Sequence, residues 1–120
     1  MSAVAEKSTV LVVEDEKESR ETLRDLLELE GYQVQTAVNG REALDVLNTS
    51  GNQICIVLLD LFMPVMDGWQ VIDQLRADGR LGTTQVLIIT SAAYKAPAGI
   101  PVLEKPLDLD KVMNEVGRRC

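Results

Sequence analysis

The sequence predicts an α/β fold in which a parallel β-sheet is covered by helices on both faces. Two observations lead to this prediction. Short apolar runs rich in Val, Leu and Ile recur along the chain, and they alternate with segments whose apolar residues have helical spacing. Such runs are typical of strands buried on both faces. Strands that alternate with helices favour parallel pairing through right-handed crossovers.

Five segments are predicted as strands. The central one, residues 54–59, contains six apolar residues without interruption and ends at Asp60. It is too short to span a membrane, and its Ile and Val content favours a strand. The other predicted strands are residues 9–13, 32–38, 86–89 and 101–104.

The remaining pattern predicts four helices, each with a start or stop signal. Gly31 is placed to end the first helix. Asn39, followed by Glu42 three residues later, resembles a capping box that opens the second helix. Asp67 precedes the third helix, and Asp108 can cap the last one.

One connection is too short for this alternating pattern. Only residues 91–104 lie between Thr90 and Lys105, and the fifth strand takes about four of them. A parallel crossover with its helix usually needs about ten to twelve residues or more. Because Pro97 and Gly99 interrupt the remainder, we predict a loop or a single turn. One face of the sheet should then be less covered near that edge.

Composition narrows the functional classes. The 120 residues, 46% of them apolar, fit one domain that comprises residues 1–120. The net charge of −7 and the lack of a dense Lys/Arg cluster disfavour direct binding to nucleic acid or to an anionic membrane, and they suit a domain that attracts cations. Because the chain contains no histidine, a Ser-His-Asp catalytic site and a His-ligated zinc site are excluded.

The two cysteines do not suggest a disulfide framework. Cys55 lies in the central apolar run and is interpreted as a small hydrophobic residue. Cys120 ends the sequence and is interpreted as incidental, or as a mark of where a longer protein was cut. Residues 1–8 are short and polar and do not resemble a signal peptide. We therefore expect a reducing, cytoplasmic setting.

Polar residues stand where the predicted strands end. Because the carboxyl ends of parallel strands share one edge of the sheet, we expect these residues to come together there: Glu14, Asp15, Asp60, Thr90 and Lys105. Three crowded carboxylates repel one another. A bound Mg²⁺ would relieve this repulsion, and Mg²⁺ prefers hard oxygen ligands.

This set of residues suits chemistry at phosphorus. With a cation in place, the ionised carboxylate of Asp60 can act as a nucleophile toward a phosphoryl group. Lys105 could hold the phosphoryl oxygens by its charge, and the hydroxyl of Thr90 could hold them by a hydrogen bond.

Four sequence segments resemble the receiver domain of bacterial two-component response regulators. They are VVEDE, LLDLFMPVMDG, LIITSA and LEKP, in this order, within a resemblance that extends over residues 9–116. Each segment alone is a weak signal, but the four together at strand ends are highly specific. The resemblance implies a flavodoxin-like, doubly wound sheet with the strand order 2-1-3-4-5.

By position, the resemblance implies a role for each catalytic residue. Asp60 would be the phosphoacceptor, Thr90 the switch hydroxyl and Lys105 the phosphate-binding lysine. The resemblance also implies a cis peptide bond between Lys105 and Pro106. The partner would be a histidine kinase or a phosphotransfer protein, and the output domain or downstream protein stays unidentified.

The resemblance likewise implies a Mg²⁺ site. Asp15 would be a direct ligand and Glu14 would assist through water. The carboxylate of Asp60 and the backbone carbonyl of Phe62 would complete the protein ligands.

The chain departs from the family in two places, so alternatives stay open. Most of the fourth helix is missing, and Val102 occupies the position, three residues before the lysine, where many receivers carry an aromatic. We expect a phosphoacceptor signalling domain that is not an enzyme beyond catalysing its own phosphorylation and dephosphorylation. The first alternative is a pseudo-receiver, a protein-binding module with atypical or no phosphorylation-dependent output. A Mg²⁺-dependent phosphohydrolase is disfavoured, because residue 62 is Phe and the chain leaves no room for a cap domain.

Overall fold

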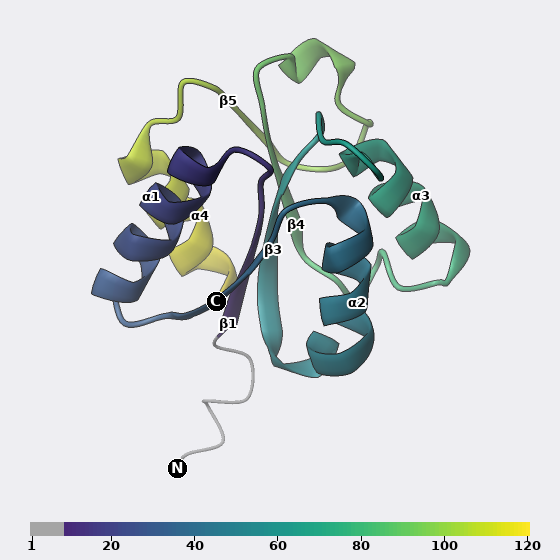
Figure 1. The fold of residues 1–120 in the computed structure, drawn as a ribbon, viewed down its shortest axis with the longest axis horizontal. Helices are drawn as coiled ribbons and strands as arrows, with labels where there is room; N and C mark the ends of the chain where they lie inside the picture. Colours follow the sequence, from purple (N-terminus) through teal and green to yellow (C-terminus); the bar gives the residue numbers. More distant parts are fainter. Residues whose placement is uncertain (1–8) are drawn as a thin grey trace.

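A computed structural model describes residues 9–120 as a five-stranded parallel sheet between two layers of helices (Figure 1). The strand order is β2-β1-β3-β4-β5, which is the doubly wound, flavodoxin-like order, and every neighbouring pair is parallel. The strands are β1 (Thr9–Val13), β2 (Gln33–Ala37), β3 (Ile54–Asp60), β4 (Val86–Thr90) and β5 (Val102–Glu104). The helices are α1 (Lys17–Leu29), α2 (Gly40–Ser50), α3 (Gly68–Ala77) and α4 (Leu109–Arg119).

The central strand is buried on both faces, which explains its uninterrupted apolar run. Val57 and Leu59 of β3 pack in one cluster with α2 and α3, whereas Ile56 and Leu58 pack in a second cluster with α1 and α4. Figure 1 shows the two helix pairs on opposite sides of the sheet. All seven residues of β3 are buried, including Asp60 at its end. The carboxylate of Asp60 therefore lies at the boundary of the two apolar clusters.

The predicted starts of α2 and α3 are formed by side-chain caps. The side chain of Asn39 accepts a hydrogen bond from the amide of Glu42 at 2.9 Å. The carboxylate of Glu42 reaches back to the amide of Val38 at 3.0 Å. Asp67 and Gln70 form a complete capping box at the start of α3. In the described part of the chain, the helices are too short or too polar to cross a membrane.

The short connection between β4 and β5 contains one 3-10 turn, Ala93–Lys95, in place of a helix, as the sequence predicted. The indole N–H of Trp69 donates to the carbonyl of Lys95 at 3.0 Å and ties this turn to α3. Ala96 and Ile100 pack against the core from the same connection. At this end of the sheet β4 is fully buried, whereas the edge strand β5 is partly exposed.

The expectation that the cysteines are unpaired is wrong. Cys55, at the start of β3, and Cys120, after α4, form a disulfide with a Cα–Cα distance of 5.4 Å. The side-chain amide of Gln85 reinforces the junction, because it donates to the carbonyls of Cys55 at 3.2 Å and Arg119 at 2.9 Å. Cys55 is buried, as predicted. The reducing, cytoplasmic setting was inferred partly from unpaired cysteines, and the location itself stays a prediction.

Candidate functional site

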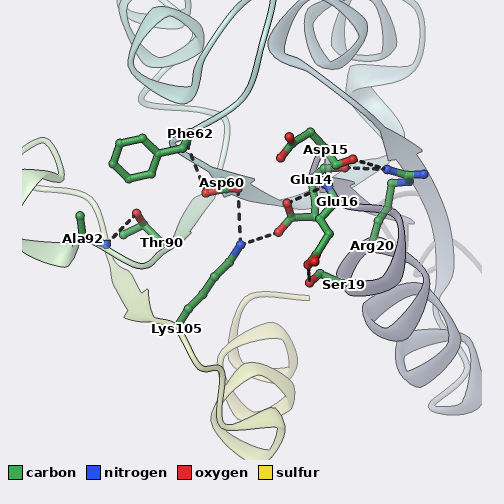
Figure 2. A network of polar contacts seen from close by, with 10 residues as sticks. All are labelled: Glu14, Asp15, Glu16, Ser19, Arg20, Asp60, Phe62, Thr90, Ala92 and Lys105. Carbon is green, nitrogen blue, oxygen red and sulfur yellow. Dashed lines mark hydrogen bonds and ion pairs between the residues drawn. The ribbon is translucent and has the colours of Figure 1, made fainter.

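The carboxyl ends of three strands bring an amine and two carboxylates into contact (Figure 2). The Nζ of Lys105, after β5, lies 2.6 Å from Oε1 of Glu14, which follows β1. The same Nζ lies 3.4 Å from Oδ2 of Asp60 at the end of β3. The lysine therefore bridges two buried acids that stand on neighbouring strands.

A third carboxylate completes an acidic cluster at this edge. One carboxylate oxygen from each of Glu14, Asp15 and Asp60 lies within 4.8 Å of the other two. Glu14 and Asp60 are 1% and 4% exposed, whereas Asp15 is exposed to solvent. The cluster offers only oxygen ligands, and its Asp15 side is open to water. These residues fit a hard divalent cation that keeps part of its hydration shell.

The charge of Lys105 is maintained by its surroundings. Burial of the ammonium lowers the pKa of Lys105, but the hydrogen bond that the ammonium donates to Glu14 and the negative charges of Asp60 and Glu14 outweigh this effect. The net result is a pKa raised above the ordinary value of 10.5. Lys105 is therefore protonated at neutral pH and neutralises part of the charge of the acidic cluster.

The loop after β3 is built closely around Asp60. The amide of Phe62 donates to Oδ1 of Asp60 at 3.3 Å. The ring of Phe62 is half-exposed and meets the ring of Trp69 edge-on, with centroids 5.2 Å apart. Trp69 therefore lies one side chain away from the acidic cluster.

Thr90 ends β4 beside the central strand. It directly follows Ile89, which is the register partner of Asp60, and it is completely buried. Its hydroxyl accepts a hydrogen bond from the amide of Ala92 at 3.1 Å. Its carbonyl accepts one from the amide of Lys105 at 2.8 Å. Figure 2 shows Thr90 on the side of Asp60 away from Glu14.

The structure also adds a residue that the sequence did not single out. The guanidinium Nη1 of Arg20, on α1, donates to the carbonyl of Glu14 at 3.0 Å and to that of Asp15 at 3.1 Å. Its targets are main-chain oxygens, which have no signature in the sequence. The Lys105–Pro106 peptide bond is cis, as the resemblance implies.

Comparisons with known proteins agree with this geometry. The response regulator receiver domain family matches residues 10–116. The chain is 36% identical over 109 residues to the response regulator MprA of Mycolicibacterium vanbaalenii, and the match covers 87% of this chain and 46% of that protein. The chain thus spans about half the length of this curated relative.

Solved receiver structures show the same fold. The receiver domain of the hybrid histidine kinase CckA has a TM-score of 0.79 and 32% identity, over 92% of this chain and 97% of that one. The response regulator TrrA from Thermotoga maritima, in complex with Mg²⁺ and BeF, has a TM-score of 0.81 and 26% identity, over 94% of this chain and 99% of that one. From its sequence match, fold and strand-end residues, this chain belongs to the receiver domain family of two-component response regulators.

Proposed function

We propose that Asp60 is the phosphoacceptor of this receiver domain and that a partner histidine kinase or phosphotransfer protein supplies the phosphoryl group. The observation that carries the proposal is the bridge formed by Lys105 between Glu14 and Asp60. The bridge places the positively charged ammonium of Lys105 beside the carboxylate that would become phosphorylated. The chain contains no histidine, so a phosphohistidine donor would have to come from another protein.

We further propose that the acidic cluster holds Mg²⁺ through Glu14, Asp15, Asp60 and the backbone carbonyl of Phe62. The spacing of the three carboxylates and their oxygen-only chemistry support this assignment. Further support comes from TrrA, a receiver of the same fold that was solved with Mg²⁺ and BeF. The cation would neutralise charge on the phosphoryl oxygens and on the acids around them.

The chain's own residues would divide the remaining work. A carboxylate oxygen of Asp60 forms the new P–O bond while the P–N bond of the donor breaks, and the electron pair returns to the donor imidazole. The ammonium of Lys105 holds a phosphoryl oxygen by charge. The hydroxyl of Thr90 accepts from Ala92, so its own hydrogen is free to donate to another phosphoryl oxygen. Later attack of water on the acyl phosphate would return Asp60 to its carboxylate form.

Labelling with acetyl phosphate tests this function directly. In the presence of Mg²⁺, intact-mass spectrometry should show the addition of one phosphoryl group, which EDTA prevents and Asp60→Asn abolishes. Asp73→Asn is the matched control, because Asp73 is an exposed acid on α3 that pairs only with Arg76 among the described residues. It should label like the wild type.

The same experiment separates the alternatives. A wild-type protein that takes up no phosphoryl group would contradict the proposal and favour a pseudo-receiver. Continued release of phosphate from small phosphate esters over many turnovers would instead indicate a phosphohydrolase.

A further inference from the structure

We propose that Arg20 is a positioning residue for the metal site. Its guanidinium would hold the backbone that follows β1, so that the carboxylates of Glu14 and Asp15 face Asp60. The inference rests on the proposed function only in assuming that the acidic cluster binds a divalent cation.

The contacts of Arg20 close a loop at the start of α1. The chain leaves β1 at Val13, passes through the acidic residues and enters α1 at Lys17. Arg20, near the beginning of this helix, sends Nη1 back to the carbonyls of Glu14 and Asp15 at 3.0 and 3.1 Å. Figure 2 shows its side chain reaching the acidic loop from the side opposite to Lys105. Two successive peptide groups are thereby held by one rigid cation.

The two acids are not equally supported by other contacts. The carboxylate of Glu14 is held by Lys105 on one oxygen and by the amide of Glu16, at 3.1 Å, on the other. The side chain of Asp15 is exposed and makes no hydrogen bond within residues 9–120. Its direction therefore depends on its own backbone, and Arg20 holds the carbonyl of that residue.

Arg20 also leaves the neighbouring carboxylates unpaired with its own charge. Within residues 9–120 it forms no ion pair within 4.0 Å, although Glu14, Asp15 and Glu16 are all close in sequence. Arg20 donates its hydrogen bonds to main-chain oxygens, so the lone pairs of the acidic side chains stay available for a cation.

The charge of Arg20 and its hold on the backbone should have opposite effects on Mg²⁺ affinity. A positive charge near the cluster repels a divalent cation, so an electrostatic effect alone would make Mg²⁺ bind more tightly once the charge is removed. If Arg20 acts by holding the backbone, its removal should weaken Mg²⁺ binding. Outer-shell partners of metal ligands typically change metal affinity by about 10- to 100-fold when they are replaced.

The test is a Mg²⁺ titration of Arg20→Gln and Arg20→Lys by calorimetry, with Trp69 fluorescence as a second readout. We expect both variants to raise the dissociation constant about 10-fold. Arg20→Lys keeps the charge but has a single ammonium in place of the planar guanidinium. The matched control is Arg24→Gln, because Arg24 lies on the same helix and pairs with Asp25 at the surface. Its affinity should equal that of the wild type.

A measurement without metal completes the design. In EDTA, the amide of Glu16 should exchange its hydrogen faster in both Arg20 variants than in the wild type, while amides of β3 keep their protection. Loss of protection throughout the sheet in Arg20→Gln would show general unfolding, and the folded Arg20→Lys variant would then decide the question.

Mg²⁺ affinity of the Arg20 variants that equals or exceeds the wild-type affinity would overturn the inference. Acetyl phosphate labelling of the wild type, run in parallel, reports on the proposed function alone. A protein that binds Mg²⁺ through an Arg20-dependent loop but is not labelled at Asp60 would refute the proposed function and leave this inference standing. A wild type that binds no Mg²⁺ would overturn this inference, whatever the labelling shows.

Discussion

At the scale of single residues, Lys105 pairs with two carboxylates at once. Glu14 and Asp60 are almost completely buried, and the ammonium of Lys105 lies 2.6 and 3.4 Å from their oxygens. Removing one partner of such a group leaves charge buried without compensation, which costs much more than a surface ion pair contributes.

We expect Lys105→Met to lower the free energy of unfolding by about 3 kcal/mol when no metal is present. Urea denaturation in EDTA measures this value, and Lys111→Met, at an exposed position on α4, should have little effect. Added Mg²⁺ should recover part of the loss, since it would supply positive charge to the same carboxylates. Equal stability of the Lys105 and Lys111 variants would contradict the structural role of Lys105.

The stabilisation from Lys105 should depend on pH only in the alkaline range. Because folding raises the pKa of Lys105 above 10.5, its contribution is complete below the unfolded-state pKa and is lost as pH rises through the folded-state pKa. The stability difference between wild type and Lys105→Met should therefore be constant near neutrality and shrink above about pH 10.5. Denaturation curves at a series of pH values check this, and a difference that shrinks around neutral pH would disprove it.

At the level of elements, the start of α3 is seated directly on the end of β3. The amide of Gly68 donates to the carbonyl of Leu61 at 2.9 Å. A Cβ at Gly68 would lie 2.5 Å from the carbonyl oxygen of Asp60 and 2.8 Å from Cα of Leu61. Both are backbone atoms and cannot move aside by changing rotamer, so this junction requires glycine.

We expect Gly68→Ala to destabilise the protein by about 1–3 kcal/mol, as other overpacked interiors do. The same variant should slow the labelling of Asp60, because the clash would displace the backbone of the acceptor. Gly82→Ala is the control, since a Cβ there meets no atom within 4 Å. Thermal denaturation and the rate of acetyl phosphate labelling provide the measurements. Wild-type behaviour of Gly68→Ala in both would show that the junction can relax.

For the molecule as a whole, the disulfide and the candidate site lie near opposite ends of the central strand β3. Cys55 is the second residue of β3 and Asp60 is the last, a separation of about 17 Å along an extended strand. The bond joins residues 65 positions apart and attaches the end of α4 to the central strand. It constrains the fold without touching the acidic cluster.

We expect reduction of the disulfide, or Cys120→Ser, to lower the free energy of unfolding by about 4 kcal/mol, from the entropy of the loop that the bond closes. Labelling of Asp60 should be unchanged under native conditions. Urea denaturation with and without a thiol reductant, together with labelling of both forms, measures the two effects. If reductant left the wild-type denaturation curve unchanged, the two cysteines would not be bonded in solution.

The sequence by itself determined the order of the elements, the parallel sheet and the absence of a full helix after β4. These features depend on local rules, namely apolar periodicity, capping residues such as Asn39 and Asp108, and the number of residues available between Thr90 and Lys105. It also indicated which polar residues would share one edge of the sheet, because the direction of parallel strands decides that.

Only the tertiary structure decided the contacts that depend on how the layers are packed. The pairing of Cys55 with Cys120 requires α4 to run back along the sheet until its end meets the start of β3. The contacts of Arg20 are made with backbone oxygens, which every residue possesses. Residue identities alone do not encode either feature, since both arise from distances between atoms that become neighbours only after the helices have docked on the sheet.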